Sequence, residues 1–421
     1  MRWIPVVACA AAVIAASSCT SSGLTPGVAA GATSPRSTHQ RTASHYSAMR
    51  SSAPRPSSTP ADSASPDSST STAEPSSQAG PAERALAAMN LAQRVGQLLM
   101  VDCPSSGVAA STVTSIRRYH AGSVILDGNS TLGVAGTATI TKQLQSLAPR
   151  GVRLFVSTDQ EGGLVQRMKG PGFVNIPSAL VQGSRTPSEL RASTRTWAGE
   201  LRSAGINVDL APVLDTVPAS SRSNPPIGDL DREYGHTPTR VASRGVAVAQ
   251  ALDAAGVAAT VKHFPGLGRV TGNTDVASGV TDDVTTRHDP YLLPFAAAIK
   301  EHVRFVMVST AIYARIDPGT PAIFSPTIVT GMLRHDLGFT GVIITDDIGA
   351  AKQVASVPAG IRAVKFIAAG GTMALTVAPA TVPLMAQRLI DRARSDAAFR
   401  RKVNAAALVV LRAKAAAGLL G

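Results

Sequence analysis

Short apolar segments alternate with helix-like stretches along most of this chain, and this alternation constrains the fold more than any other feature. Strands that alternate with helices form a parallel sheet, and eight of them close a barrel. We therefore predict an α/β fold with a single (β/α)8 TIM-type barrel. A doubly wound open sheet is the competing architecture, less favoured because no strand is followed by a dinucleotide-type glycine fingerprint. The eight strand candidates are Gln97–Val101, Gly122–Leu126, Arg153–Ser157, Ile206–Leu210, Val257–Val261, Arg304–Ser309, Val342–Thr345 and Thr372–Val377.

Alanine- and leucine-rich stretches typical of helices lie between these segments. The chain from Pro383 to Leu419 is predicted to close the fold as two further helices. Together these segments assign residues 81–421 to one barrel domain. The other predicted helices are Pro187–Ser203, Arg240–Ala255, Pro290–Glu301, Pro326–Asp336 and Ala359–Ala369.

The chain before the barrel has the character of an export signal and a linker. Residues 1–18 contain an early Arg2, an apolar run and small residues directly before Cys19. This pattern predicts a lipoprotein signal peptide with the lipid on Cys19, which would hold the exported protein on the extracytoplasmic, cell-wall side of a membrane. Ordinary cleavage nearby, with Cys19 incidental, is the alternative. Residues 19–80 are rich in Ser, Thr and Pro and are predicted to form a disordered tether.

Charge and cysteine content argue against several classes of function. The formal net charge is +13, but only 4% of the residues are aromatic and the Arg residues are scattered, so we expect no nucleic-acid binding. Cys103 has no partner in the barrel segment, and no Cys/His cluster has zinc-ligand spacing. We expect no metal and no cofactor.

Polar residues follow four of the predicted strands. Because the carboxyl ends of parallel barrel strands lie at one face, these groups should converge on one mouth. Carboxylates together with Lys and Arg suit a neutral, hydroxyl-rich ligand. Each group also has a structural explanation, since Asp215 or Asp347 could cap the next helix and Lys262 could neutralise a buried carboxylate. The residues are Asp159-Gln160-Glu161-Gly162-Gly163 with Arg167 after the third strand, Asp215 after the fourth, Lys262-His263 after the fifth and Asp346-Asp347 after the seventh.

Three of these motifs, in this order, resemble glycoside hydrolase family 3. They are Thr158-Asp159-Gln160-Glu161-Gly162-Gly163 with Arg167, Lys262-His263-Phe264-Pro265-Gly266-x-Gly268, and the run from Gly338 to Asp347. The chain is most similar to the single-domain bacterial β-N-acetylhexosaminidases of that family. The resemblance implies a retaining hydrolase that removes terminal β-linked N-acetylglucosamine, with cell-wall-derived sugars as substrates.

The resemblance also implies roles for individual residues. Asp346 matches the nucleophile, which attacks the anomeric carbon and forms a covalent glycosyl-enzyme. The matched sugar-binding positions are Asp159, Arg167, Arg232, Lys262 and His263.

The chain departs from the family where the general acid/base should be. Close relatives carry Asp-Ser-His on the loop after the Lys-His motif, with the His as acid/base, whereas this chain has Asn273-Thr274-Asp275. Leu267 and Thr310 also stand where relatives tend to have His. Three interpretations remain open: Asp275 is the acid/base, with a carboxylate separation of about 5–5.5 Å from the nucleophile; another loop residue takes its place; or the acid/base is lost. The loop residues that the second interpretation offers are Asp282, Asp283 and His288.

These interpretations give competing functions. The preferred one is a β-N-acetylhexosaminidase with Asp346 as nucleophile. A weakly active or non-catalytic envelope lipoprotein that binds sugars follows from loss of the acid/base. A family 3 β-glucosidase is the weaker alternative, because the chain has no second sandwich-type domain of the kind that such relatives often carry.

Overall fold

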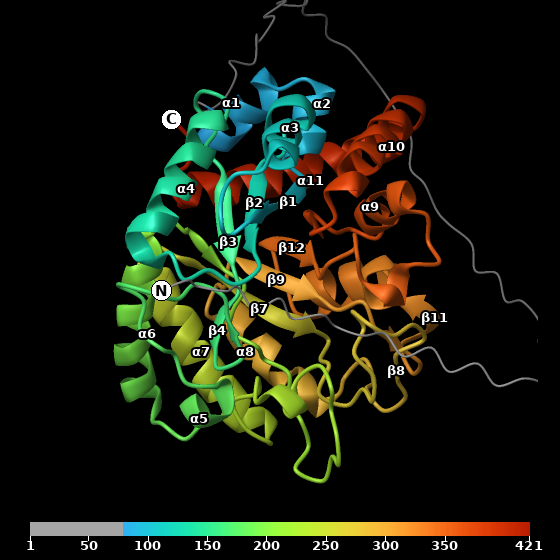
Figure 1. Cartoon of the computed structure of the whole chain (residues 1–421). Coiled ribbons are helices and arrows are strands. Elements are labelled where there is room, and N and C mark those ends of the chain that lie inside the picture. Colours follow the sequence, from blue (N-terminus) through green and yellow to red (C-terminus); the bar gives the residue numbers. More distant parts are fainter. Residues whose placement is uncertain (1–78) are drawn as a thin grey trace, which may run out of the picture. The chain divides into compact units, whose positions relative to one another are not determined.

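The computed structural model describes residues 79–421, and the barrel predicted from the sequence is present in it (Figure 1). Eight parallel strands follow the order β12-β9-β7-β6-β3-β2-β1-β13, and a parallel bridge between Ile344 and Met373 joins the two ends of this order. The predicted signal peptide, Cys19 and all but the last two residues of the predicted tether lie outside the described residues. The eight strands are β1 Leu99–Pro104, β2 Ser123–Asp127, β3 Phe155–Thr158, β6 Val208–Asp209, β7 Ala258–Phe264, β9 Phe305–Val308, β12 Val342–Thr345 and β13 Ala374–Thr376.

Helices connect successive strands and surround the sheet, as the alternation in the sequence predicts. Local signals explain where several begin: α6 starts at Pro187 behind a capping box of Thr186 and Glu189, and α2 starts behind one of Asn90 and Gln93. The predicted Pro326–Asp336 helix is present with π-type hydrogen bonding, as η4 Thr327–Asp336. The α-helices are α1 Pro81–Ala88, α2 Leu91–Gly96, α3 Ala110–Tyr119, α4 Gly133–Leu147, α5 Ala179–Gly183, α6 Pro187–Ser203, α7 Pro238–Ala254, α8 Leu293–Lys300, α9 Ala359–Ala368, α10 Val382–Ser395 and α11 Ala397–Ala416.

Short strands decorate the loops at the carboxyl ends of the barrel strands. β4 Gln160–Gly162 pairs with β5 Val165–Gln166 directly after β3. β8 Thr281–Asp282, β10 Ile312–Tyr313 and β11 Asp317–Pro321 form a second small sheet. These additions shape the mouth of the barrel, where function is expected.

Side chains fill the barrel, so that it has a packed core rather than a pore. Phe155 and Phe305 meet edge to face with ring centroids 5.2 Å apart, and both are fully buried. Burial of such a side chain contributes about 1.5–3 kcal/mol. The other buried residues of this interior are Met100, Ile125, Val208, Leu210, Ala258, Met307, Val342, Ile344, Met373 and Leu375, with Val410 and Leu419 from the C-terminal segment.

Helix α11 closes the end of the barrel opposite the mouth. Its Lys414 is fully buried, and Nζ donates to Gln97 Oε1 and to the Gly122 carbonyl, both at 2.8 Å. Burial lowers the pKa of Lys414 to about 7. Because Gln97 and Gly122 directly precede β1 and β2, α11 lies against the amino ends of the strands. Among residues 79–421, no helix combines the length and apolar character that crossing a membrane requires.

Seven of the eight predicted strands differ from the structure by one to three residues at an end, and two of these differences have a physical reason. The fifth strand, expected to end at Val261, continues as β7 through Lys262 and His263 to Phe264. A prediction from apolar residues alone ends this strand too early, because the polar side chains of Lys262 and His263 are buried by ion pairs rather than by apolar contacts. The first strand begins at Leu99, since Gln97 still belongs to the end of α2.

Candidate active site

A cavity of about 350 Å³ opens at the carboxyl ends of the barrel strands, and we call it the mouth cavity. The predicted nucleophile, the preferred acid/base and all five predicted sugar-binding residues line it, which the convergence of parallel strand ends anticipates. These residues are Asp159, Arg167, Arg232, Lys262, His263, Asp275 and Asp346. Apolar side chains, including Leu210, Met307 and Leu375, form its floor where the packed interior of the barrel begins.

Lys262 is the central cation of the site. Its side chain is 2% exposed, and Nζ lies 2.5 Å from Asp159 Oδ1 and 2.6 Å from Glu161 Oε1. Burial alone would lower the pKa of Lys262, but the attraction of Asp159 and Glu161 outweighs it, so the pKa is raised. Lys262 is therefore a permanently charged donor whose position is fixed by two carboxylates.

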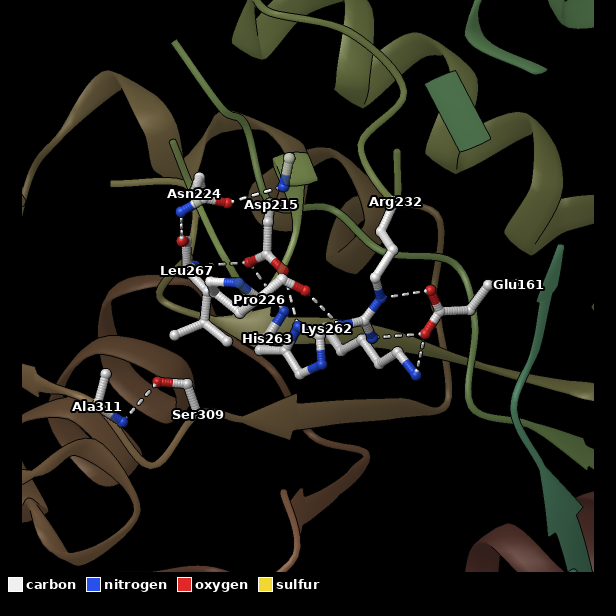
Figure 2. A network of polar contacts seen from close by, with 12 residues as sticks. Glu161, Asp215, Asn224, Pro226, Arg232, Lys262, His263, Leu267, Ser309 and Ala311 are labelled. Carbon is white, nitrogen blue, oxygen red and sulfur yellow. Dashed lines mark hydrogen bonds and ion pairs between the residues drawn. The ribbon is translucent and has the colours of Figure 1, made fainter. Parts of the chain in front are cut away.

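Glu161 also binds Arg232 through two hydrogen bonds, with Nε donating at 2.8 Å and Nη2 at 2.7 Å. Arg232 Nη1 donates to the Pro226 carbonyl at 2.7 Å (Figure 2). Burial opposes ionisation of Glu161, yet Arg232 and Lys262 hold the pKa of this carboxyl well below its usual range. Glu161 thus neutralises both cations. From the sequence alone, Glu161 belonged to the motif after the third strand but had no predicted role.

Asp215 orients His263 instead of capping a helix. Its Oδ2 lies 2.7 Å from His263 Nδ1, and its Oδ1 accepts from the backbone N–H groups of His263 and Leu267 at 3.1 and 2.8 Å. Asp215 is fully buried, and Figure 2 shows its carboxylate pointing toward His263. A carboxylate at Nδ1 fixes the proton there and leaves Nε2 for a ligand in the mouth cavity.

Asn224 holds the loop that carries Arg232 against the loop that follows β7. It is buried, and Nδ2 donates to the carbonyls of Leu267 and Val270, both at 2.8 Å. Its Oδ1 accepts from the Gly228 N–H at 2.9 Å. Arg167, in contrast, lines the cavity, and its buried Nε has no hydrogen-bond partner among the described residues.

Asp346 and Asp347 follow β12 but have different surroundings. Asp347 accepts hydrogen bonds from the N–H groups of Gly349, Ala350, Ala351 and Val377, at 2.7–3.2 Å, and so fixes the loop after β12. Both residues line the mouth cavity, but among residues 79–421 Asp346 accepts a hydrogen bond from the N–H of Asp347 alone, at 2.9 Å. The Asp346 carboxylate is thus the one that can react.

Asp275 lies on the opposite loop and its electrostatic environment suits an acid. Desolvation, followed by repulsion from Asp346, raises the pKa of Asp275 to about 6, while His263 opposes the rise. Asp275 is exposed and lines the mouth cavity, so the desolvation comes from the surrounding walls rather than from complete burial. Its backbone N–H donates to Asn273 Oδ1 at 2.9 Å. A carboxyl with this pKa can exchange protons near neutral pH.

The other acid/base candidates lie outside the mouth cavity. Asp282 is buried and accepts from the N–H groups of Val284 and Thr285 and from the Thr285 hydroxyl, at 2.6–2.8 Å, so it stabilises its own loop. Asp283 and His288 are exposed, and neither lines the cavity. Within residues 79–421, no group of three or more His, Cys, Asp and Glu side chains has an arrangement that could hold a metal ion.

Comparisons with known proteins agree with this geometry. The model of the glycosyl hydrolase family 3 N terminal domain matches residues 90–413. A beta-hexosaminidase of Xanthomonas oryzae pv. oryzae is 32% identical over 294 residues, which cover 67% of this chain and 81% of the relative. The crystal structure of a beta-N-acetylhexosaminidase from Beutenbergia cavernae is 45% identical with a TM-score of 0.77, and the match covers 78% of this chain and 99% of that one. A glycoside hydrolase family 3 beta-N-acetylglucosaminidase from Paenibacillus is 28% identical with a TM-score of 0.73, covering 79% of this chain and 63% of that one.

Proposed function

The chain belongs to glycosyl hydrolase family 3, and from that premise we propose that it is a retaining glycosidase that removes terminal β-linked N-acetylglucosamine. The observation that carries the proposal is the pair Asp275 and Asp346, which line one cavity and interact electrostatically. Two carboxyl groups on either side of a glycosidic bond are what a retaining mechanism requires. The similar hexosaminidases support the choice of N-acetylglucosamine.

The reaction proceeds in two displacements. Asp346 attacks the anomeric carbon, the bond to the leaving oxygen breaks with its electron pair on that oxygen, and protonated Asp275 donates the proton. Asp275, now ionised, then takes a proton from water. The resulting hydroxide displaces Asp346 and releases the sugar with its configuration retained. The two displacements together return both carboxyl groups to their starting protonation states.

The remaining polar groups of the cavity bind the sugar. Lys262 and Arg167 present donors, while Asp159 and His263 Nε2 present acceptors. Hydroxyl groups both donate and accept, so this mixed set suits a neutral sugar better than an anion. Since Lys262 and Arg232 are already held by Glu161, they bind without reorganising when the sugar arrives.

The test compares wild type, Asp346→Ala and Asp283→Ala in the release of an aryl N-acetyl-β-glucosaminide. Asp283 is exposed and outside the cavity, so it is the matched control. We expect loss of turnover only in Asp346→Ala. Equal rates in all three proteins would refute the assignment of Asp346.

Two alternative functions are separated by the same substrates. A sugar-binding protein without catalysis would bind N-acetylglucosamine in calorimetry and turn over no β-glycoside. A β-glucosidase would favour the aryl glucoside over the N-acetylglucosaminide. The raised pKa of Asp275 argues against a protein without catalysis, because it makes Asp275 a usable acid on the loop where close relatives carry a His.

We further propose that the enzyme is lipid-anchored through Cys19 on the extracytoplasmic side of a membrane, where wall-derived N-acetylglucosamine glycosides are its substrates. The support is the sequence of residues 1–19. Wild type should partition into detergent from its native membranes, and Cys19→Ser should not. Equal partitioning of the two would reject the anchor.

A further inference from the structure

Two loops carry the proposed catalytic pair, and they are joined directly. We call residues 266–280 the acid loop, because it carries Asp275, and residues 346–357 the nucleophile loop, because it begins with Asp346. The backbone N–H groups of Lys352 and Gln353 donate to the carbonyls of Asp275 and Thr274, both at 3.0 Å. The acid loop therefore lies against the nucleophile loop at the catalytic residue itself.

The side chain of Gln353 makes a second connection. Its Oε1 accepts from the Val280 N–H at 2.8 Å, and its Nε2 donates to the Val280 carbonyl at 3.0 Å. Gln353 and Val280 are each 6% exposed, so these bonds are shielded from water. A primary amide that satisfies both backbone groups of one residue fixes the position and direction of the chain there.

The acid loop has little other support between its two ends. Residues 271–279 form no helix or strand, and most of them are exposed or half-buried. The hydrogen bonds of Asn224 hold the start of the loop, at Leu267 and Val270. Gln353 holds its end, directly before β8, together with Ile312, whose N–H donates to the Val280 carbonyl at 3.0 Å.

The nucleophile loop, in comparison, is held in place by several hydrogen bonds. Asp347 accepts four backbone N–H groups within and beside it. Arg362 donates from Nη1 to the carbonyls of Ile348 and Gly349, and from Nε to that of Val357, at 2.7–2.9 Å. The end of the acid loop that Gln353 binds is therefore held in a fixed position relative to Asp346.

We propose that Gln353 is a positioning residue, which sets the separation between the acid Asp275 and the nucleophile Asp346 by clamping the acid loop to the nucleophile loop. This inference rests on the proposed function. The clamp also explains how an acid on a loop without regular structure stays close enough to Asp346 for its pKa to be raised.

The test uses Gln353→Met, which keeps the size of the side chain and removes both hydrogen bonds to Val280. Lys352→Ala is the matched control, since Lys352 is the neighbouring exposed residue and contributes through its backbone, which the substitution retains. Hydrogen exchange of the amides of residues 274–280 reports on the clamp. Rates with aryl N-acetyl-β-glucosaminides of different leaving-group pKa report on delivery of the acid.

Gln353→Met should exchange these amides faster and lose kcat/KM by about 10²-fold with poor leaving groups. Activated leaving groups need little acid assistance, so their rates should change only a few-fold, and the alkaline limb of the pH profile should move to lower pH. Gln353→Glu keeps an acceptor for the Val280 N–H and should lie between Gln353→Met and wild type. It also carries the test if Gln353→Met fails to fold.

Unchanged exchange and an unchanged leaving-group dependence in a folded variant would overturn the positioning role. A uniform loss across all leaving groups would do the same. Absence of turnover in the wild type would instead overturn the proposed function, and the positioning role with it, so the two failures are distinguishable.

Discussion

Removal of the Asp275 carboxyl is the perturbation that separates an active enzyme from a sugar-binding protein. The pKa of this group is raised from the ordinary 3.8 to about 6. At pH 6 about half of the molecules would then carry the proton, against about 0.6% at the ordinary value, so the surroundings increase the acid form about 80-fold. Because the protonated form is the one that donates, kcat/KM should fall as pH rises through about 6.

Asp275→Ala should remove this alkaline limb and reduce kcat/KM by about 10²–10⁴-fold for poor leaving groups. For an activated aryl glycoside the first displacement should change far less. The assay is kcat/KM against pH for a series of aryl N-acetyl-β-glucosaminides, with Asp283→Ala as the control. A small loss that is equal for all leaving groups, with the limb still present, would refute the role of Asp275.

The electrostatic origin of the raised pKa can be measured without turnover. Repulsion from Asp346 contributes to it, second to desolvation. Asp346→Asn removes that charge and should lower the pKa of Asp275 in an NMR titration of the carboxyl carbons. A pKa that stays at about 6 would mean that desolvation alone accounts for it.

Three further outcomes follow from individual polar side chains. Asn273→Asp adds a like charge beside Asp275, so the alkaline limb of kcat/KM should move to higher pH; a limb that does not move would contradict the contact at the Asp275 N–H. Glu161→Gln leaves Lys262 and Arg232 without their shared buried carboxylate, and should cost about 3–5 kcal/mol in a denaturant titration; a loss below ~1 kcal/mol would contradict it. Lys414 is charged in the unfolded chain and has a pKa of about 7 in the fold, so unfolding binds a proton between about pH 7 and 10.5. In this window the free energy of unfolding of the wild type should therefore rise with pH relative to that of Lys414→Met, with a slope of up to ~1.4 kcal/mol per pH unit. Parallel curves of unfolding free energy against pH for the two proteins would refute the lowered pKa of Lys414.

The barrel and its mouth were predictable because both depend on repeating local patterns. Eight apolar segments with helices between them define the sheet, and polar residues at the ends of these segments must converge. Glu161 had a usable signal as well, since it lies two residues after Asp159 and can therefore share one side of an extended chain. Both carboxylates do contact Lys262.

The contacts that fix the loops were not predictable in this way. Gln353 meets Val280 across 73 residues of sequence, and Asn224 meets Leu267 across 43. Neither amide belongs to a periodic pattern or a strand end, so only the folded chain reveals its partner. The extension of β7 through Lys262 was not predicted for a related reason. The burial of Lys262 depends on carboxylates at the end of another strand, which the apolar pattern does not reveal.

The central claim, a covalent intermediate on Asp346 that Asp275 helps to form and to hydrolyse, has one direct measurement. Asp275→Ala is mixed with an activated aryl N-acetyl-β-glucosaminide, quenched in acid, digested and mapped by mass spectrometry. Without Asp275 to activate water, the glycosyl-enzyme should accumulate, and one N-acetylglucosaminyl unit should appear on the peptide that contains Asp346. Turnover without an adduct, together with inversion at the anomeric carbon of the released sugar, would contradict the mechanism.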